Sequence, residues 1–347
     1  MRFASWGWTM LISEVRERTS EGLLDFAWRQ WAQVGVSAGV VGRDQWAIDP
    51  EALILFTVGL ARREPRLFDE MLDWLALNHS LLSMQRLRNL TNRFPVDACL
   101  VAAVIAWIRE PVPAQLLKGQ EQRDRAAAKT PVFSPDVLGF VAKADPTFEE
   151  FGFIRPRATR SGKSREPDAM APVNLAFQLR HLFGPGSRSE VMRVLLTYTH
   201  GPLDAARISD EACFAKRNAS DALTALASSG VIKAMWSGNE RQFTASRDKW
   251  AGLLNYGSAA ELPSFVSWVH LLPAALEIII WLDSEAGKAD SEYLTASRAR
   301  GLVDRISREL EAAGVDTPKG RPADGAPYLS TIAHTVDSLL ANLALAG

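Results

Sequence analysis

The sequence predicts a mainly α-helical protein that contains a small β-hairpin near its middle. Apolar residues recur at helical spacing through most of the 347 residues. Proline and short polar residues mark several helix starts. The period changes to an extended pattern after Gly230. We expect a multi-helical N-terminal domain at 1–150, a basic flexible loop at 151–170, a trihelical unit with the hairpin at 171–257, and C-terminal helices at 258–347.

The N-terminal domain is expected to begin with a helix over about residues 1–34, where Leu23, Trp31 and Val34 lie on an apolar stripe. Asp49-Pro50-Glu51 predicts the start of the next helix, because it combines an N-cap carboxylate, a proline at the first helical position and an acid in the first turn. Pro65 opens a third helix, and Ser83 is expected to cap a fourth. These signals predict a trihelical set over residues 49–93.

Two basic stretches follow. Lys118 to Lys129 is a charge-rich helical run, typical of a solvated face. Phe153 to Pro167 has no helical period and carries five basic residues before its first acid, Glu166. Serine, glycine and proline interleave with these basic residues, which predicts a flexible loop. The loop is either a linker or a segment that closes onto phosphate groups.

The central unit is expected to contain helices at about 189–198, 206–214 and 218–229. In the last of these, Ala219, Ala222, Leu223 and Leu226 form one apolar stripe. Gly230 follows where a helix commonly ends on a left-handed residue. Residues 231–236 and 241–244 then read as two strands around a turn at 237–239, before a helix at 247–254.

The phrase KRNASDALTALASSGVI…NERQFTAS, which begins at Lys216, resembles the recognition helix and wing of bacterial winged helix-turn-helix regulators of the MarR and ArsR type. The resemblance covers about seventy residues, a fifth of the chain. It implies sequence-specific binding of double-stranded DNA and transcription regulation. Some regulators of this general kind are antitoxins that accompany nucleotidyltransferase toxins and repress their own operon, so the resemblance also admits a partner toxin.

In such a domain the N-terminal end of the second helix of the turn lies in the major groove. We expect Arg217 to pair with guanine or a phosphate and Asn218 to pair with adenine. The wing residues Lys233 and Arg241 are expected to meet phosphates or the minor groove. The full set of candidate DNA-binding residues is Lys216, Arg217, Asn218, Ser220, Thr224, Lys233, Arg241, Arg155, Arg157, Arg160 and Lys163.

The alternative is a winged-helix protein-interaction module within a larger complex, without specific DNA binding. Charge distinguishes the two functions. DNA binding is favoured if the basic residues of the helix and wing share one surface with the loop. The interaction module is favoured if acids such as Asp210, Asp221 and Glu240 interrupt that surface.

Residues 49–93 could form a second helix-turn-helix. The helix that starts after Ser83 is expected to show polar and basic side chains outward, namely Gln85, Arg86, Arg88, Asn89 and Arg93. The other interpretation, which we favour, is a helical packing module whose last helix is solvated.

Composition predicts a cytoplasmic protein. The net charge of −1 gives no global attraction to nucleic acid. Two cysteines, Cys99 and Cys213, fit a reducing compartment. No secretory signal is evident, and the eleven tryptophans are expected to be buried. Residues 262–282 are long enough to cross a bilayer, but Glu277 would be costly there, so we expect a buried or dimer-forming helix and no membrane association.

The sequence does not predict an enzyme, a metal site or a cofactor. Gly162-Lys163-Ser164 ends like a phosphate-binding loop but lacks the upstream glycine and the preceding strand. The five histidines have no metal-ligand spacing. The resemblance to winged helix-turn-helix regulators implies a DNA-binding homodimer, with the C-terminal helices packing or dimerising.

Overall fold

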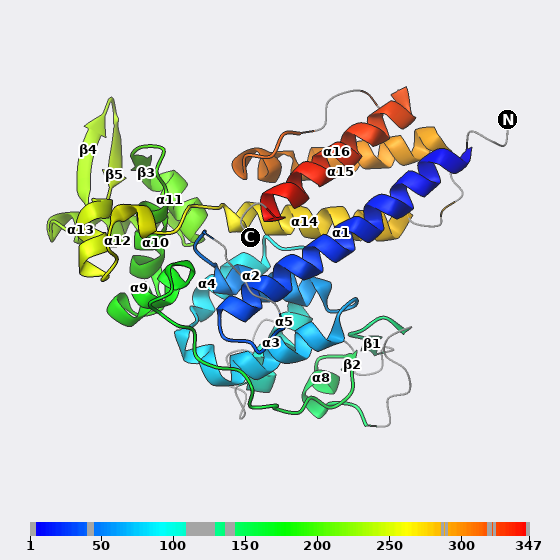
Figure 1. Ribbon diagram of the computed structural model, residues 1–347, viewed down its shortest axis with the longest axis horizontal. Coiled ribbons are helices and arrows are strands. Elements are labelled where there is room, and N and C mark those ends of the chain that lie inside the picture. The colour runs from blue at the N-terminus through cyan, green and yellow to red at the C-terminus, as the bar shows by residue number, and fades with distance from the viewer. Residues whose placement is uncertain are drawn as a thin grey trace. The chain divides into compact units, whose positions relative to one another are not determined.

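The computed structural model describes residues 5–39, 45–108, 129–135, 143–285, 288, 291–317, 321 and 324–344, which form a mainly helical protein with two small sheets (Figure 1). Its longer helices are α1 (Ser5–Gln33), α2 (Pro50–Leu60), α3 (Pro65–Asn78), α4 (Met84–Thr91), α5 (Ala98–Ile108), α8 (Pro146–Glu150), α9 (Leu175–Phe183), α10 (Ser187–Thr197), α11 (Ala205–Ala212), α12 (Lys216–Ser228), α13 (Arg247–Leu253), α14 (Trp268–Glu285), α15 (Glu292–Ala312) and α16 (Ala326–Ala344). The strands are β1 (Thr130–Pro131), β2 (Phe153–Ile154), β3 (Leu203–Asp204), β4 (Lys233–Ser237) and β5 (Glu240–Thr244).

The chain divides into two compact units. Unit 1 contains residues 1–28 and 267–347, and unit 2 contains residues 29–266. This grouping differs from the division expected at 150, 170 and 257, because the N-terminal part of α1 packs with the C-terminal helices. A side chain at Gly22 would lie 2.9 Å from Leu340 of α16, so α1 and α16 approach closely at that glycine. The ring centroids of Phe26 and Trp268 are 5.4 Å apart.

In unit 1, α14 is the most buried helix, and α15 packs along it. The buried carboxylate of Glu285 at the end of α14 is 3.0 Å from the guanidinium of Arg298 on α15. In the part of the chain that the structure describes, no helix is both long enough and apolar enough to cross a bilayer.

In unit 2, aromatic residues hold the N-terminal helices together. The rings of Trp31 and Trp74 meet edge to face, 5.3 Å apart, and Trp74 also meets Phe177 of α9. Each indole N–H has a partner, since Trp31 donates to the Thr57 hydroxyl and Trp74 to the Val34 carbonyl. Buried tryptophans were expected, and Trp236 is an exception, with 73% of its surface exposed.

Several predicted helix starts are confirmed. Asp49 accepts a hydrogen bond from the Ala52 amide, and Pro50 is the first residue of α2. Ser83 caps α4 through the Arg86 amide. Gly230 has a φ of +75°, the left-handed conformation expected after α12. The charge-rich helix expected at Lys118–Lys129 lies, except for Lys129, outside the described residues.

Candidate nucleic-acid interface

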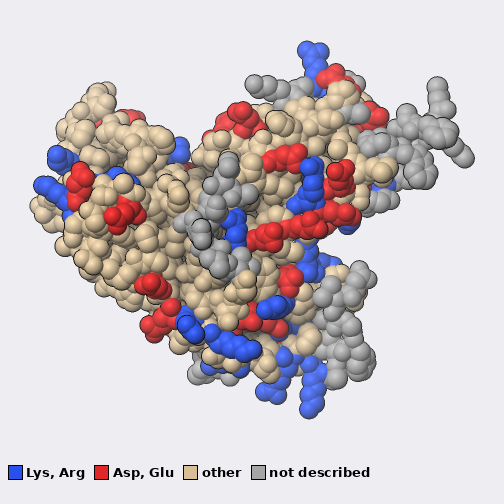
Figure 2. All heavy atoms as spheres, viewed as in Figure 1, with Lys and Arg blue, Asp and Glu red and all other residues tan. Residues whose placement is uncertain are grey.

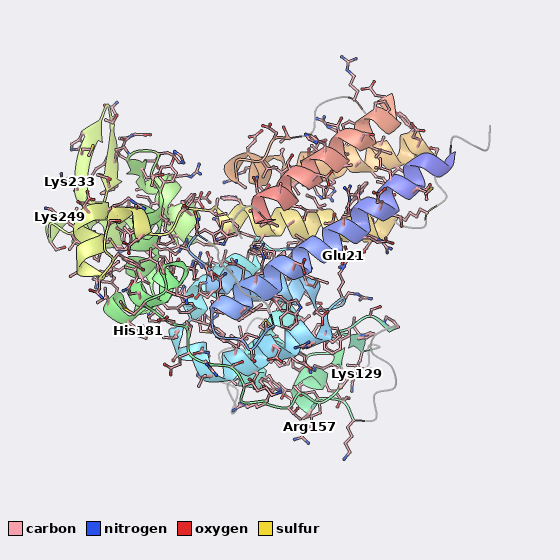
Figure 3. The ribbon with its side chains drawn as sticks, viewed as in Figure 1. Glu21, Lys129, Arg157, His181, Lys233 and Lys249 are labelled. Atoms are coloured by element: carbon pink, nitrogen blue, oxygen red, sulfur yellow. The ribbon has the colours of Figure 1, made fainter. Side chains whose placement is uncertain are left out.

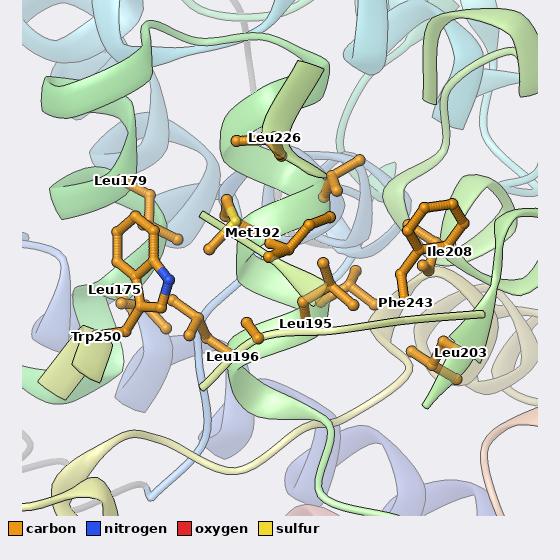
Figure 4. Close-up of a cluster of buried hydrophobic side chains, with 14 of the residues drawn as sticks. Leu175, Leu179, Met192, Leu195, Leu196, Leu203, Ile208, Leu226, Phe243 and Trp250 are labelled. Atoms are coloured by element: carbon orange, nitrogen blue, oxygen red, sulfur yellow. The ribbon is translucent and has the colours of Figure 1, made fainter. Parts of the chain in front are cut away.

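The region from α9 to α13 is built around one apolar core (Figure 4). Helix α10 supplies Leu195 and Leu196, α11 supplies Ile208, α12 supplies Leu226, and β5 supplies Phe243. The predicted stripe of Ala219, Ala222, Leu223 and Leu226 is buried in this core. Because one face of α12 is used in this way, its opposite face remains at the surface.

The three-stranded sheet of this region has the order β3-β5-β4 and is antiparallel. Strands β4 and β5 form the predicted hairpin, in which Trp236 pairs with Arg241 next to the turn. The two-residue strand β3, between α10 and α11, pairs with β5 through Leu203 and Phe243. It was not expected from the sequence, where only a turn at Gly201-Pro202 is evident.

The turn between α11 and α12 is tight. Cys213 occupies the left-handed region with a φ of 53°, which is uncommon for a residue with a side chain. Its thiol is buried, and burial raises the pKa of Cys213, so a reactive thiolate is disfavoured. Asp204 caps the start of α11 through the Arg207 amide.

Helix α4 holds this turn in place. Arg86 Nε donates to the Ala212 carbonyl at 2.8 Å, and Asn89 Nδ2 donates to the Cys213 carbonyl at 2.9 Å. Arg93 pairs with Asp210 at 2.8 Å. The expectation that Arg86 faces outward is therefore wrong, because its guanidinium is fully buried against α11. Gln85 and Arg88 are exposed, as expected.

The surface of α12 carries the first group of candidate residues. Lys216, Arg217 and Thr224 are exposed, whereas Asn218 and Ser220 are half-buried. The exposed face also includes Ala225 and Ser228 and one acid, Asp221. Most side chains beyond the first turn are short, so the backbone of α12 can approach a partner closely.

The hairpin carries Lys233 and Arg241, which are both exposed. The guanidinium carbon of Arg241 lies 5.3 Å from the centre of the Phe243 ring, which steadies its side chain. Glu240 is exposed beside it, and Figure 2 shows acidic and basic side chains interspersed on the α12 and α13 end of unit 2. The charge of this surface is therefore mixed.

The basic loop is tied to α3 through its backbone. The Asp73 carboxylate accepts hydrogen bonds from the amides of Ser161, Gly162 and Ser164, at 2.7, 3.0 and 3.3 Å. These bonds lower the pKa of Asp73 although burial, the largest single influence, raises it. The amides of Gly162 and Ser164 are consequently occupied by a carboxylate of the protein itself, and the Lys163 amide donates to the Ser161 hydroxyl.

The expectation that Arg155 contacts a phosphate is wrong, because its side chain is buried. Only 1% of its side chain is exposed, and its guanidinium is 2.6 Å from Asp69. It also lies over the rings of Phe68, Phe133 and Phe148, at 5.1–5.6 Å. The guanidinium of Arg155 is therefore paired within the fold and is not at the surface, where a phosphate could reach it.

The other loop residues, Arg157, Arg160 and Lys163, are exposed but are not gathered with the hairpin. Figure 3 shows Arg157 near α8 and Lys233 on β4, at opposite ends of unit 2. The structure therefore brings the α12 and hairpin residues to one end and leaves the loop at the other.

A cluster of six charged side chains in unit 2 was missed by the sequence analysis. We call it the buried charge cluster, and its members are Asp49, Glu51, Arg86, Arg180, Glu190 and Arg193. None of these side chains is more than 3% exposed. Three arginines face three carboxylates, so the formal charges cancel.

Arg86 forms a two-pronged contact with Asp49, with both N–O distances at 2.6 Å, and a third contact with Glu51 at 2.9 Å. Arg180 bridges Glu51 and Glu190 at 2.7 Å each, and Arg193 lies 2.8 Å from Glu190. Burial raises the pKa of Glu190, but Arg86, Arg193 and Arg180 together lower that pKa well below its ordinary value. The cluster thus joins α2 and α4 to α9 and α10 in charged form.

One signal could have found part of this cluster. In α10, Glu190 and Arg193 are three residues apart and lie on the same face of the helix as Ser189 and Thr197. An acid and an arginine at this spacing can form an ion pair across one turn, but the same pattern is typical of a solvated face, so the spacing indicates the pair and not its burial. No comparable pattern surrounds Arg86.

In comparisons with known proteins, no family model, curated protein or solved structure matches this chain.

Proposed function

We propose that the protein binds double-stranded DNA through α12, with the β4–β5 hairpin as a wing, and that it regulates transcription. The observation that carries the proposal is the order of elements, α10-β3-α11-α12-β4-β5, with a three-stranded β3-β5-β4 sheet. This is the order of a winged helix-turn-helix, in which the second helix of the turn enters the major groove.

The surface of α12 supports this assignment. Lys216 and Arg217 lie at its N-terminal end, where a recognition helix meets base edges and phosphates. Ser220 and Thr224 follow on the outer face as short side chains with hydroxyl groups. The carbonyl contacts from Arg86 and Asn89 fix the preceding turn, so α12 is held in a defined orientation before any partner arrives.

The proposed interface contains Lys216, Arg217, Asn218, Ser220 and Thr224 of α12 and Lys233 and Arg241 of the wing. The loop residues Arg157, Arg160 and Lys163 stand apart from it, because they lie toward the other end of unit 2. The homodimer and the partner toxin implied by the resemblance stay predictions.

An anisotropy titration tests the proposal. The probes are a duplex from the protein's own promoter and a scrambled duplex of equal length, each at two salt concentrations. We expect tighter binding to the promoter, and we expect the double variant Arg217→Ala, Asn218→Ala to bind both duplexes equally. Equal affinity of the unaltered protein for both duplexes would contradict sequence-specific binding.

A second candidate function, a protein-interaction module, is favoured by the charge distribution, since the exposed acids Asp221 and Glu240 lie among the basic residues of α12 and the wing, and the basic loop lies at the other end of unit 2. It is also favoured by the exposed apolar side chains of β4. Trp236 is 73% exposed and Met235 is 40% exposed, on a strand that forms the edge of its sheet. Tryptophan is enriched among residues that dominate protein–protein binding. If the unaltered protein binds neither duplex at low salt, this becomes the better assignment. Retained duplex binding in Trp236→Ala, with loss in Arg217→Ala, would instead support DNA binding.

A further inference from the structure

A cavity of about 310 Å³ lies beside α8, at the opposite end of unit 2 from the wing. Its lining includes Trp107 at the end of α5, Asp145 and Thr147 at the start of α8, and Arg157, Ala158 and Arg160 from the loop. This volume falls at the lower end of the range for small-molecule sites, which is roughly 300–1,000 Å³. The cavity is separate from α12 and the wing.

The acid in the wall of the cavity is already engaged. Asp145 is 2% exposed, and its Oδ1 accepts hydrogen bonds from the amides of Thr147 and Phe148, at 3.1 and 3.4 Å. Its Oδ2 accepts from the Ala158 amide at 3.0 Å. The carboxylate therefore ties the loop to α8 and makes no ion pair with the arginines of the cavity.

The two arginines that line the cavity are available to an anionic ligand. Arg157 and Arg160 are exposed, and within the described residues neither is paired with a carboxylate. Arg155, only two residues earlier, is fully buried and paired with Asp69. The guanidinium carbon of Arg160 lies 5.5 Å from the centre of the Trp107 ring, which holds that side chain beside the cavity.

We propose that this cavity binds a phosphate group, with Arg157 and Arg160 as its cationic ligands. Guanidinium groups recognise phosphate through parallel N–H donors. The two arginines outweigh the single carboxylate of the lining, Asp145, whose oxygens are held by backbone amides. Thr147 is a further polar residue in the lining. Basic side chains also gather over this end of unit 2 in Figure 2.

The phosphate belongs either to a free small molecule or to a nucleic-acid backbone, and the dimensions of the cavity favour the small molecule. The site is independent of the proposed DNA interface, because no lining residue belongs to α12 or the wing. Arg217→Ala should therefore leave phosphate binding unchanged.

Isothermal titration calorimetry of the full chain tests the proposal, with inorganic phosphate and AMP as probes and chloride at matched ionic strength as the blank. We expect saturable binding that weakens at least about tenfold in Arg157→Ala, Arg160→Ala, the factor that corresponds to loss of one charge-assisted contact. Lys163→Ala is the matched control, because Lys163 is an exposed basic residue of the same loop outside the lining of the cavity. Circular dichroism of each variant checks that the fold is retained.

A scrambled duplex distinguishes the two sources of phosphate. Binding of phosphate or AMP that the double variant loses supports a small-molecule site. Loss of duplex affinity in the double variant, without AMP or phosphate binding by the unaltered protein, assigns the cavity to backbone phosphate. The proposal is overturned if the double variant behaves like the unaltered protein toward every probe, or if Lys163→Ala causes the same loss.

Discussion

The buried charge cluster and the outer face of α12 use the same residue types in opposite environments. Arg86 and Arg193 are enclosed and each faces a carboxylate at hydrogen-bond distance, whereas Lys216 and Arg217 are open to solvent. Removing one partner of a buried set leaves an uncompensated charge, while an exposed arginine loses little when water replaces its neighbours. The stability of the fold therefore depends on the buried charge cluster, and binding, under our proposal, depends on the exposed residues of α12.

The largest expected effect is on folding stability. Arg86→Ala should lower the free energy of unfolding by about 3–5 kcal/mol, because Asp49 would remain buried without its main partner and Glu51 would keep only one of its two arginines, Arg180. Arg88→Ala, on the exposed side of the same helix, should change it by less than about 0.5 kcal/mol. Urea denaturation measures both. Similar urea midpoints for the two variants would contradict a stabilising role of the buried charge cluster.

The next effect is acid sensitivity. The lowered pKa values of Asp49 and Glu190 mean that the folded state favours their charged forms. Their stabilisation is therefore complete above the pKa of an unfolded carboxyl group, about 4, and is lost as the pH falls toward the lowered folded values. We expect the free energy of unfolding to hold from about pH 7 to about pH 5 and then to fall, by an amount on the order of 2 kcal/mol or more.

Denaturation curves across this range check the acid effect. Glu190→Gln should be less stable than the unaltered protein near neutral pH and should lose less on acidification, because one titrating carboxylate is gone. Parallel pH curves for the two proteins would show that other carboxylates account for the loss.

On the outer face of α12, Arg217→Ala or Asn218→Ala should reduce the preference for the promoter duplex by about 1–3 kcal/mol, as expected for a lost base contact. Neither change should move the urea midpoint appreciably, since Arg217 is exposed and Asn218 is half-buried. Anisotropy with matched and scrambled duplexes measures the preference. A change in stability without a change in the preference for the promoter duplex would mean that these residues stabilise the fold and do not contact bases.

The smallest effect belongs to the wing. Lys233→Ala should weaken binding to all duplexes alike and reduce the slope of log affinity against log salt by about 1. Lys163→Ala, at the other end of unit 2, should leave that slope unchanged. An equal effect of both substitutions would mean that the basic loop shares the DNA surface after all.

Much of the secondary structure follows from local signals. Helix boundaries depend on residues close by in the chain. The starts of α2 and α4 and the end of α12 could therefore be predicted from Asp49-Pro50, Ser83 and Gly230. The β4–β5 hairpin could be predicted for the same reason, because its two strands are neighbours in the chain. Strand β3 is not, because two residues cannot establish a period and its partner Phe243 lies forty residues away.

Side-chain environments were harder to predict where they depend on distant contacts. A charged residue on a short polar helix is normally solvated, so Arg86 was expected to face outward. Its burial follows from Asp49 and Ala212, 37 and 126 residues away. Arg155 was misplaced similarly, since a basic loop gives no sign that one arginine turns back onto Asp69. The packing of α1 with α16 likewise joins opposite ends of the chain.

The loop that carries Gly162-Lys163-Ser164 has a further consequence. Its converging amides already enclose a carboxylate from α3, as an anion-binding loop would enclose a phosphate oxygen. Asp73 is thus the anion that these amides bind, so they are not available to a phosphate group. A short sequence that suggests nucleotide chemistry here serves to fasten a loop to a helix.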